Sequence, residues 1–225
     1  MGCFTSRNDI TPEETAVMDF ESLLGYSDLS PSHLDKIHRK YSYNGKISEN
    51  QWKDICDTLK LAPSKIEASQ HINNYYDKYR SGENAFALNE LLVLGILLSK
   101  GKPGEKAKLL FEVYDEKGLG ELDLSQIHDL LSVMVKIAIE LNPQVVVKDG
   151  VNGVSIQDLT KYFEKLNKGK GVAIGMAEME ILNKNGSVKS TEFVKMLNGK
   201  MSYFVSPHGI RKYVKMQMPA RSKTL

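Results

Sequence analysis

The sequence predicts an all-α fold of two lobes, each formed by a pair of helix–loop–helix units. Two observations support this prediction. Apolar residues recur at helical spacing on both sides of a twelve-residue segment at 115–126. That segment has glycine at its sixth position and leucine at its eighth, and similar segments recur elsewhere in the chain. We expect the loops of each pair to meet in a short antiparallel β ribbon.

The composition is that of an ordinary globular protein. Of 225 residues, 41% are hydrophobic and 26% are charged, which excludes a disordered or collagen-like chain. Two cysteines, Cys3 and Cys56, are too few for a disulfide framework and favour a reducing compartment. The longest apolar run, at 91–98, is far shorter than the roughly twenty residues of a bilayer span. The sequence therefore predicts no transmembrane helix.

The first residues, in a segment that we delimit as 1–24, fit an acylation pattern. The chain begins Met-Gly-Cys-Phe-Thr-Ser, which matches M-G-x-x-x-[ST] with Gly2 as the myristoylation site. Cys3 beside it is a candidate for palmitoylation. One acyl chain binds a bilayer only marginally, whereas two chains hold stably. The pattern predicts attachment to the cytoplasmic face of a membrane, with the plasma and ciliary membranes as candidates.

The clearest loop, which we call loop three, runs from Asp115 to Gln126. Gly120 stands where a sharp turn needs a positive φ, Leu122 follows two residues later, and a helical apolar pattern resumes at Ile127. This segment resembles an EF-hand. The stretch 98–134 is similar to the third hand of neuronal-calcium-sensor and calcineurin-B-like proteins, which contain four such hands.

Three weaker copies extend the resemblance over residues 25–200. Loop four (181–192) has Gly186 and Val188 at the sixth and eighth positions. Loop one is shortened and has Gly45 and Ile47, and loop two (79–90) has Phe86 at its eighth position. In the family, the eighth residues of paired loops exchange backbone hydrogen bonds. The resemblance therefore pairs Ile47 with Phe86 in a lobe at 25–100, and Leu122 with Val188 in a lobe at 101–202.

The eighth residues of loops three and four are about thirty residues further apart in sequence than those of the other consecutive loops. This indicates an insertion near 142–175. Its glycines, including Gly169, Gly171 and Gly175, predict loops. Ser155 is a candidate helix start for a helix through Leu166. A fifth, broken hand at 163–174 is the alternative.

The resemblance implies calcium, but the loops depart from its ligand pattern. Calcium requires six to eight oxygens, with carboxylates at the first, third and fifth positions and a bidentate glutamate at the twelfth. Lys117 and Gln126 occupy the third and twelfth positions of loop three, while Tyr79 and Ile181 open loops two and four. The remaining weak candidates are Asp115, Asp123, Asn183, Asn185, Ser187, Glu192, Ser81, Glu83 and Glu90. We expect weak or lost calcium binding and no other cofactor.

The C-terminal tail at 203–225 is basic. No acidic residue follows Glu192, and residues 193–225 carry seven basic side chains. We expect residues 203–216 to dock on the second lobe through Phe204, Ile210, Tyr213, Val214 and Met216, with the remainder free. Contact with anionic lipid is the alternative.

Together these patterns favour a membrane-anchored regulatory or adaptor protein that binds a partner helix and not nucleic acid. The methionines of the second lobe are compatible with a helix-binding groove or with ordinary core: Met134, Met176, Met179, Met196 and Met201. A genuine calcium sensor with non-standard loops is one alternative, and a constitutive component of a cytoskeletal or ciliary assembly, bound to its polymer, is another. No phosphate-binding loop or nucleophile elbow is present, so we do not expect an enzyme.

Overall fold

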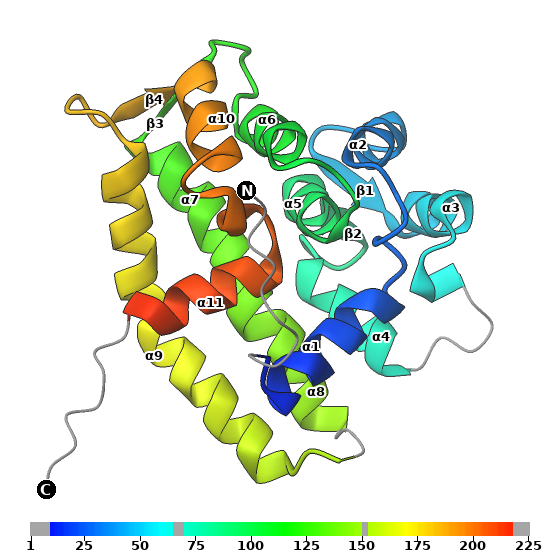
Figure 1. Ribbon diagram of the computed structural model, residues 1–225. Helices are drawn as coiled ribbons and strands as arrows, with labels where there is room; N and C mark the ends of the chain where they lie inside the picture. The colour runs from blue at the N-terminus through cyan, green and yellow to red at the C-terminus, as the bar shows by residue number, and fades with distance from the viewer. Residues whose placement is uncertain (1–9, 65–69, 150–152, 218–225) are drawn as a thin grey trace, which may run out of the picture.

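The computed structural model describes residues 10–64, 70–149 and 153–217. Within these residues the chain is mostly helical and contains two small antiparallel sheets of two strands each (Figure 1). The predicted all-α class with short antiparallel ribbons is confirmed at this level.

The first half of the chain contains one sheet. Its elements are α1 (Pro12–Leu23), α2 (Pro31–Lys40), β1 (Lys46–Ser48), α3 (Glu49–Leu59), the 3-10 turn η2 (Ala62–Ser64), α4 (Gln70–Tyr76), the 3-10 turn η3 (Asp77–Tyr79), β2 (Ala85–Ala87) and α5 (Leu88–Leu98). β1 pairs with β2, and Ile47 lies opposite Phe86. The resemblance found in the sequence predicts this same residue pair.

The second half repeats this order with a longer connection. Its elements are α6 (Pro103–Tyr114), β3 (Glu121–Asp123), α7 (Leu124–Lys136), the π-helical turn η4 (Ile137–Leu141), α8 (Asn142–Asp149), α9 (Ile156–Ile181), β4 (Ser187–Lys189), α10 (Ser190–Asn198), the 3-10 turn η5 (Ser202–Val205) and α11 (Pro207–Gln217). β3 pairs with β4, and Leu122 lies opposite Val188.

The short strands have local causes. Gly45, Gly120 and Gly186 have φ values of 70°, 71° and 73°, and each lies immediately before a strand. A side chain at these backbone angles would be strained, so glycine is the natural residue there. Each strand leads directly into a helix, and Ser48 and Asp123 cap their helices through reciprocal bonds with the glutamine three residues on.

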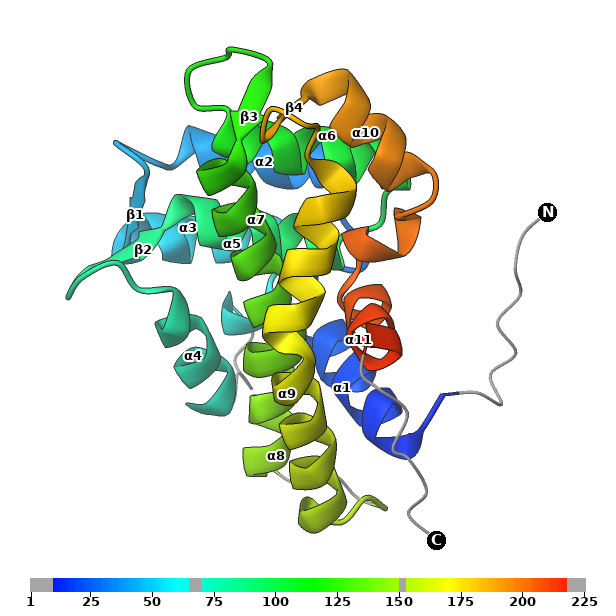
Figure 2. The same cartoon turned by 90° about the vertical axis from the view of Figure 1, so that its left-hand side faces the viewer.

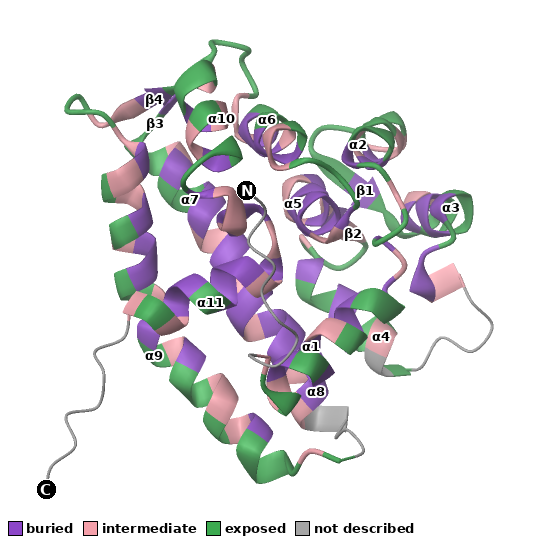
Figure 3. Cartoon of the chain, viewed as in Figure 1, coloured by how far each residue is buried: buried purple, intermediate pink, exposed green. Residues whose placement is uncertain are grey.

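The core is one contiguous cluster to which both halves contribute. α5 lies at its centre, and its apolar run is buried almost all the way round (Figure 3). The run that the sequence shows at 91–98 is therefore a core helix. α5 packs on α2 from the first half and on α6 from the second.

The insertion near 142–175 is largely helical, so the prediction of loops is wrong at Gly169, Gly171 and Gly175, although Gly153 does lie in a turn between α8 and α9. α9 is 26 residues long, and Gly169, Gly171 and Gly175 lie inside it. Each glycine costs about 1 kcal/mol of helix stability. Burial of side chains such as Leu166 and Ile174 against neighbouring helices offsets that cost. Ser155 does cap the start of this helix, because its hydroxyl accepts from Asp158 N at 3.1 Å, but the helix continues well beyond Leu166 and leaves no room for a fifth hand.

One helix is longer and more apolar than the sequence analysis predicts. Residues Leu124–Val147, which join α7, η4 and α8, form a 24-residue helix that contains an 18-residue window with a mean hydropathy of 1.6, long and apolar enough to cross a membrane by those two criteria. Of the residues in that window, 61% are buried inside the fold. Two of its charged side chains are paired: Lys136 contacts Glu90 at 3.3 Å, and Glu140 contacts Lys170. These properties are those of a core helix.

Candidate functional site

The side-chain oxygens of loop three bind the protein's own backbone. Asp115 accepts hydrogen bonds from the backbone N–H groups of Leu119 and Gly120, both at 2.8 Å. Asp123 accepts from Gln126 N at 2.9 Å as a helix cap, and the Gln126 amide also donates to the carbonyl of Tyr114 at 3.0 Å. The loop is thus closed by internal donors.

Loop four is organised in the same way. The amide oxygen of Asn183 accepts from the backbone N–H groups of Asn185 and Ser187 at 2.8 and 3.3 Å. The Ser187 hydroxyl donates to Glu121 at 2.6 Å across the sheet. Glu192 is exposed in the first turn of α10. The structure does not gather the candidate ligands of this loop around a common point.

Loop two holds a cation of its own. The Arg80 guanidinium lies 2.7 Å from both Glu49 and Asp77, and it donates to the Glu83 carbonyl at 3.2 Å. The same group stacks 4.8 Å from the ring centre of Phe86. Glu90 is engaged elsewhere, with Lys136. Ser81 uses its backbone N–H to reach Ala85 O at 2.7 Å.

Loop one is a tight turn. Tyr43 and Lys46 exchange backbone hydrogen bonds at 2.8 and 3.0 Å across Asn44 and Gly45. Across all the residues that the structure describes, no group of three or more His, Cys, Asp or Glu side chains is arranged to hold a metal ion.

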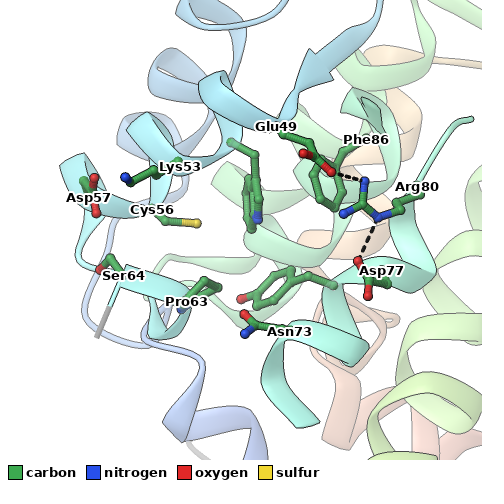
Figure 4. A pocket seen from close by; sticks show the side chains of 12 residues that line it. Glu49, Lys53, Cys56, Asp57, Pro63, Ser64, Asn73, Asp77, Arg80 and Phe86 are labelled. Carbon is green, nitrogen blue, oxygen red and sulfur yellow. Dashed lines mark hydrogen bonds and ion pairs between the residues drawn. The ribbon is translucent and has the colours of Figure 1, made fainter. Parts of the chain in front are cut away.

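The first half carries an open hollow of about 310 Å³ between α3, η2 and α4 (Figure 4). Its inner wall is aromatic: the Trp52 ring lies 5.0 Å from Tyr76 and 5.5 Å from Phe86, measured between ring centres. Cys56 is buried there, and burial raises the pKa of its thiol well above the ordinary value. Charged and polar side chains form the rim: Glu49, Lys53, Asp57, Ser64, Asn73, Asp77 and Arg80.

The second half is covered by the chain's own C-terminal helix. α11 packs on α9, on the π-helical turn η4 and on α7. Phe204, Ile210, Tyr213 and Val214 are all buried, whereas Met216 is 58% exposed. Residues 203–216 therefore dock as the sequence predicts, except for Met216. Gln217, which we expect to be free, instead ends α11, and residues 218–225 lie outside the described residues.

A buried ion cluster of Glu14, Glu21 and Arg211 joins α1 to α11. Arg211 is fully buried and lies 2.8 Å from Glu14 and 2.5 Å from Glu21. It also donates to the carbonyl of Ala138 at 3.1 Å, in the π-helical turn. Burial alone would raise the pKa of Glu14, but a hydrogen bond from His208 and the charge of Arg211 outweigh it and hold that pKa far below its ordinary value.

The cluster extends into the first half through Asn142. Its amide group donates to Glu21 at 2.7 Å and accepts from the Tyr75 hydroxyl at 2.7 Å. Tyr75 in turn bonds to the Tyr79 hydroxyl at 2.9 Å. This chain of hydrogen bonds runs from the C-terminal helix to loop two.

Sequence reasoning missed both α1 and this cluster. A usable signal exists, because Glu14, Val17, Glu21 and Leu24 fall on one face of a helix at spacings of three and four residues. Acidic side chains on an apolar face indicate a buried partner of opposite charge. The lipidation candidates Gly2 and Cys3 lie outside the described residues.

Comparison with known protein families finds no match to this chain. Comparison with curated protein sequences finds no match either.

Proposed function

We propose that this protein is a membrane-anchored, EF-hand-type regulator or adaptor that binds a helical segment of a partner protein with little dependence on calcium. Support for the EF-hand part comes from the loop geometry. Each of the four loops places a three-residue strand directly before a helix, and the strands pair one with two and three with four.

The proposal of weak calcium dependence rests on one observation: side-chain oxygens of the loops already accept hydrogen bonds from the protein's own backbone. Asp115 and Asn183 already accept two backbone hydrogen bonds each. An incoming ion would have to displace these donors, and loop two already contains the Arg80 guanidinium among its acidic neighbours. Calcium in the millimolar range would therefore add little binding free energy.

The partner site that we propose is the hollow beside Trp52. Helix-in-groove recognition uses a few apolar anchors that enter pockets lined by aromatic or flexible apolar side chains. A hollow of about 310 Å³ matches one or two such anchors. The second half supports this mode by analogy, because α11 is itself an amphipathic helix that packs with Ile210 and Val214 facing inward.

The test uses Trp52, which is the single tryptophan of the chain. A synthetic amphipathic leucine/lysine helix is titrated into the protein, with a scrambled peptide of the same composition as control. We expect the helical peptide to shift the Trp52 emission equally in calcium and in chelator. An Asn73→Phe variant, whose added ring fills the hollow, should lose the response. An unchanged response in that variant would place the binding surface elsewhere.

A further inference from the structure

One face of α9 is exposed along its whole length and changes character from basic to apolar. Side chains at spacings of three and four residues share a helix face. The exposed face of α9 carries, in order, Lys161, Lys165, Lys168, Val172, Met176 and Met179. Val172 is 55% and Met179 is 71% exposed, so neither is covered by the elements that the structure describes.

α11 widens the basic end of this face. Lys215 Nζ lies 4.5 Å from the ring centre of Tyr162 on α9. Burial and the neighbouring positive charges of Arg211 and Lys165 lower the pKa of Lys215, which indicates that the two helices bring their cations close together. α11 contains no acidic residue. We call the six exposed residues of α9 together with Lys215 the α9/α11 face.

Acidic side chains balance this charge only in part. Asp158, at the start of α9, lies 3.8 Å from Lys161. Glu164 is exposed at the edge of the face, about a quarter-turn from its centre. Lys165 and Lys168 form no ion pair with a described carboxylate.

The N-terminal helix begins beside this face. Glu14, in the first turn of α1, accepts hydrogen bonds from Tyr162 on α9 and, at 3.2 Å, from Lys215 on α11. Figure 2 shows α1, α9 and α11 side by side. Gly2, the candidate myristoylation site, precedes the helix cap Thr11 by nine residues of sequence.

We propose that the α9/α11 face lies against an anionic phospholipid bilayer. This inference rests on the proposed membrane anchor and assigns the surface that meets the membrane. Each lysine near an anionic bilayer strengthens binding by about fivefold. Exposed Val172 and Met179 match the shallow apolar contact of helices that lie in the plane of the interface. A basic patch beside a single acyl chain also converts marginal attachment into stable attachment.

The test uses full-length protein made without an acyltransferase, so that the face is measured without the anchor. Sedimentation is compared with vesicles of phosphatidylcholine alone and vesicles in which a third of the lipid is phosphatidylserine. We expect binding to the anionic vesicles only. Lys161→Gln/Lys165→Gln/Lys168→Gln should weaken it on the order of a hundredfold, and Val172→Gln/Met179→Gln should weaken it several-fold. Glutamine is a good helix former, so α9 is retained.

The matched control removes three exposed lysines elsewhere: Lys78→Gln/Lys117→Gln/Lys184→Gln. It has the same net charge as the triple variant of α9 and should bind like wild type. Equal loss in both triple variants, or no binding of wild type to anionic vesicles, overturns the inference. Binding to polyglutamate that depends on the α9 lysines, without binding to vesicles, also overturns it and assigns the face to an acidic polymer. None of these results tests the proposed acyl anchor. The anchor is tested separately, by the membrane partition of Gly2→Ala in acylated protein.

Discussion

Replacing Arg211 by methionine tests whether the buried ion cluster holds α11 in place. Methionine preserves the length of the side chain but removes the guanidinium from Glu14 and Glu21, which are 2% and 8% exposed. Removal of one partner from a buried ion pair costs about 3–5 kcal/mol, because the remaining charge stays buried and unpaired. With a urea dependence of about 2 kcal/mol per molar, the unfolding midpoint should fall by about 2 M.

The variant should also weaken the pH dependence that Glu14 contributes. In wild type the folded-state pKa of Glu14 is depressed, so its contribution to the unfolding free energy is present above its ordinary value of 4.5 and is lost as pH falls below that value. Without Arg211, the pKa of this carboxyl rises from its depressed value, but His208, Tyr162 and Lys215 still contact Glu14 and oppose the effect of burial. The unfolding free energy of Arg211→Met should therefore fall less than that of wild type as pH is lowered from 7 to 4.

The assay is urea unfolding followed by circular dichroism at both pH values. Lys212→Met, an exposed neighbour on the same helix, is the matched control and should change the unfolding free energy by less than about 0.5 kcal/mol. Arg211→Met/Glu14→Gln/Glu21→Gln should recover at least half of the loss, since no unpaired charge remains buried. An unfolding midpoint for Arg211→Met equal to that of Lys212→Met would refute the reasoning.

Three further predictions concern the anchor, the loops and the tail. Gly2→Ala should move the acylated protein from the membrane to the soluble fraction and Cys3→Ser should leave weak, reversible binding, as measured by fractionation; unchanged partition of Gly2→Ala would exclude the anchor. Calcium at millimolar concentration should raise the melting temperature by less than about 3 °C in calorimetry, which corresponds to about 1 kcal/mol for a chain of this size; a larger rise would show that a loop binds the ion tightly. Deletion of residues 203–225 together with Glu14→Gln/Glu21→Gln should increase the fluorescence of a hydrophobic dye, because the apolar contacts of Ile210 and Val214 are lost; unchanged fluorescence would contradict the docking of α11.

The features that the sequence could predict depend on short stretches of chain. Gly120 and Gly186 mark positive φ angles, and Leu122 and Val188 follow them at a fixed distance, so the strand pair could be located without knowledge of the fold. The helix start at Ser155 is likewise a local capping signal. The turn glycine and the apolar residue two positions after it are nearly sufficient to set the register of a two-stranded ribbon.

The features that it could not predict depend on contacts between distant segments. Glu14 and Arg211 are 197 residues apart, and each looks like an ordinary surface charge in the sequence. The glycines of α9 predict loops until the packing of α7 and α11 against that helix is known. Arg80 could not be recognised as the cation of loop two, because Glu49 reaches it from the other strand's helix.

The same contacts argue for where a partner helix would bind. Calcium sensors expose a groove when the ion reorganises their loops. Here the loop oxygens are occupied by the protein's own donors, and the surface of α9 and α7 that could serve as a second groove is covered by α11. If the ion cluster holds α11 with about 3–5 kcal/mol, the uncovered state has a population of less than about one in a hundred, and a partner's affinity for that surface falls by the same factor. The hollow beside Trp52 carries no such cost, because it is open in the folded protein. A partner helix should therefore bind the first half, while α11 remains in place and keeps Lys215 on the α9/α11 face.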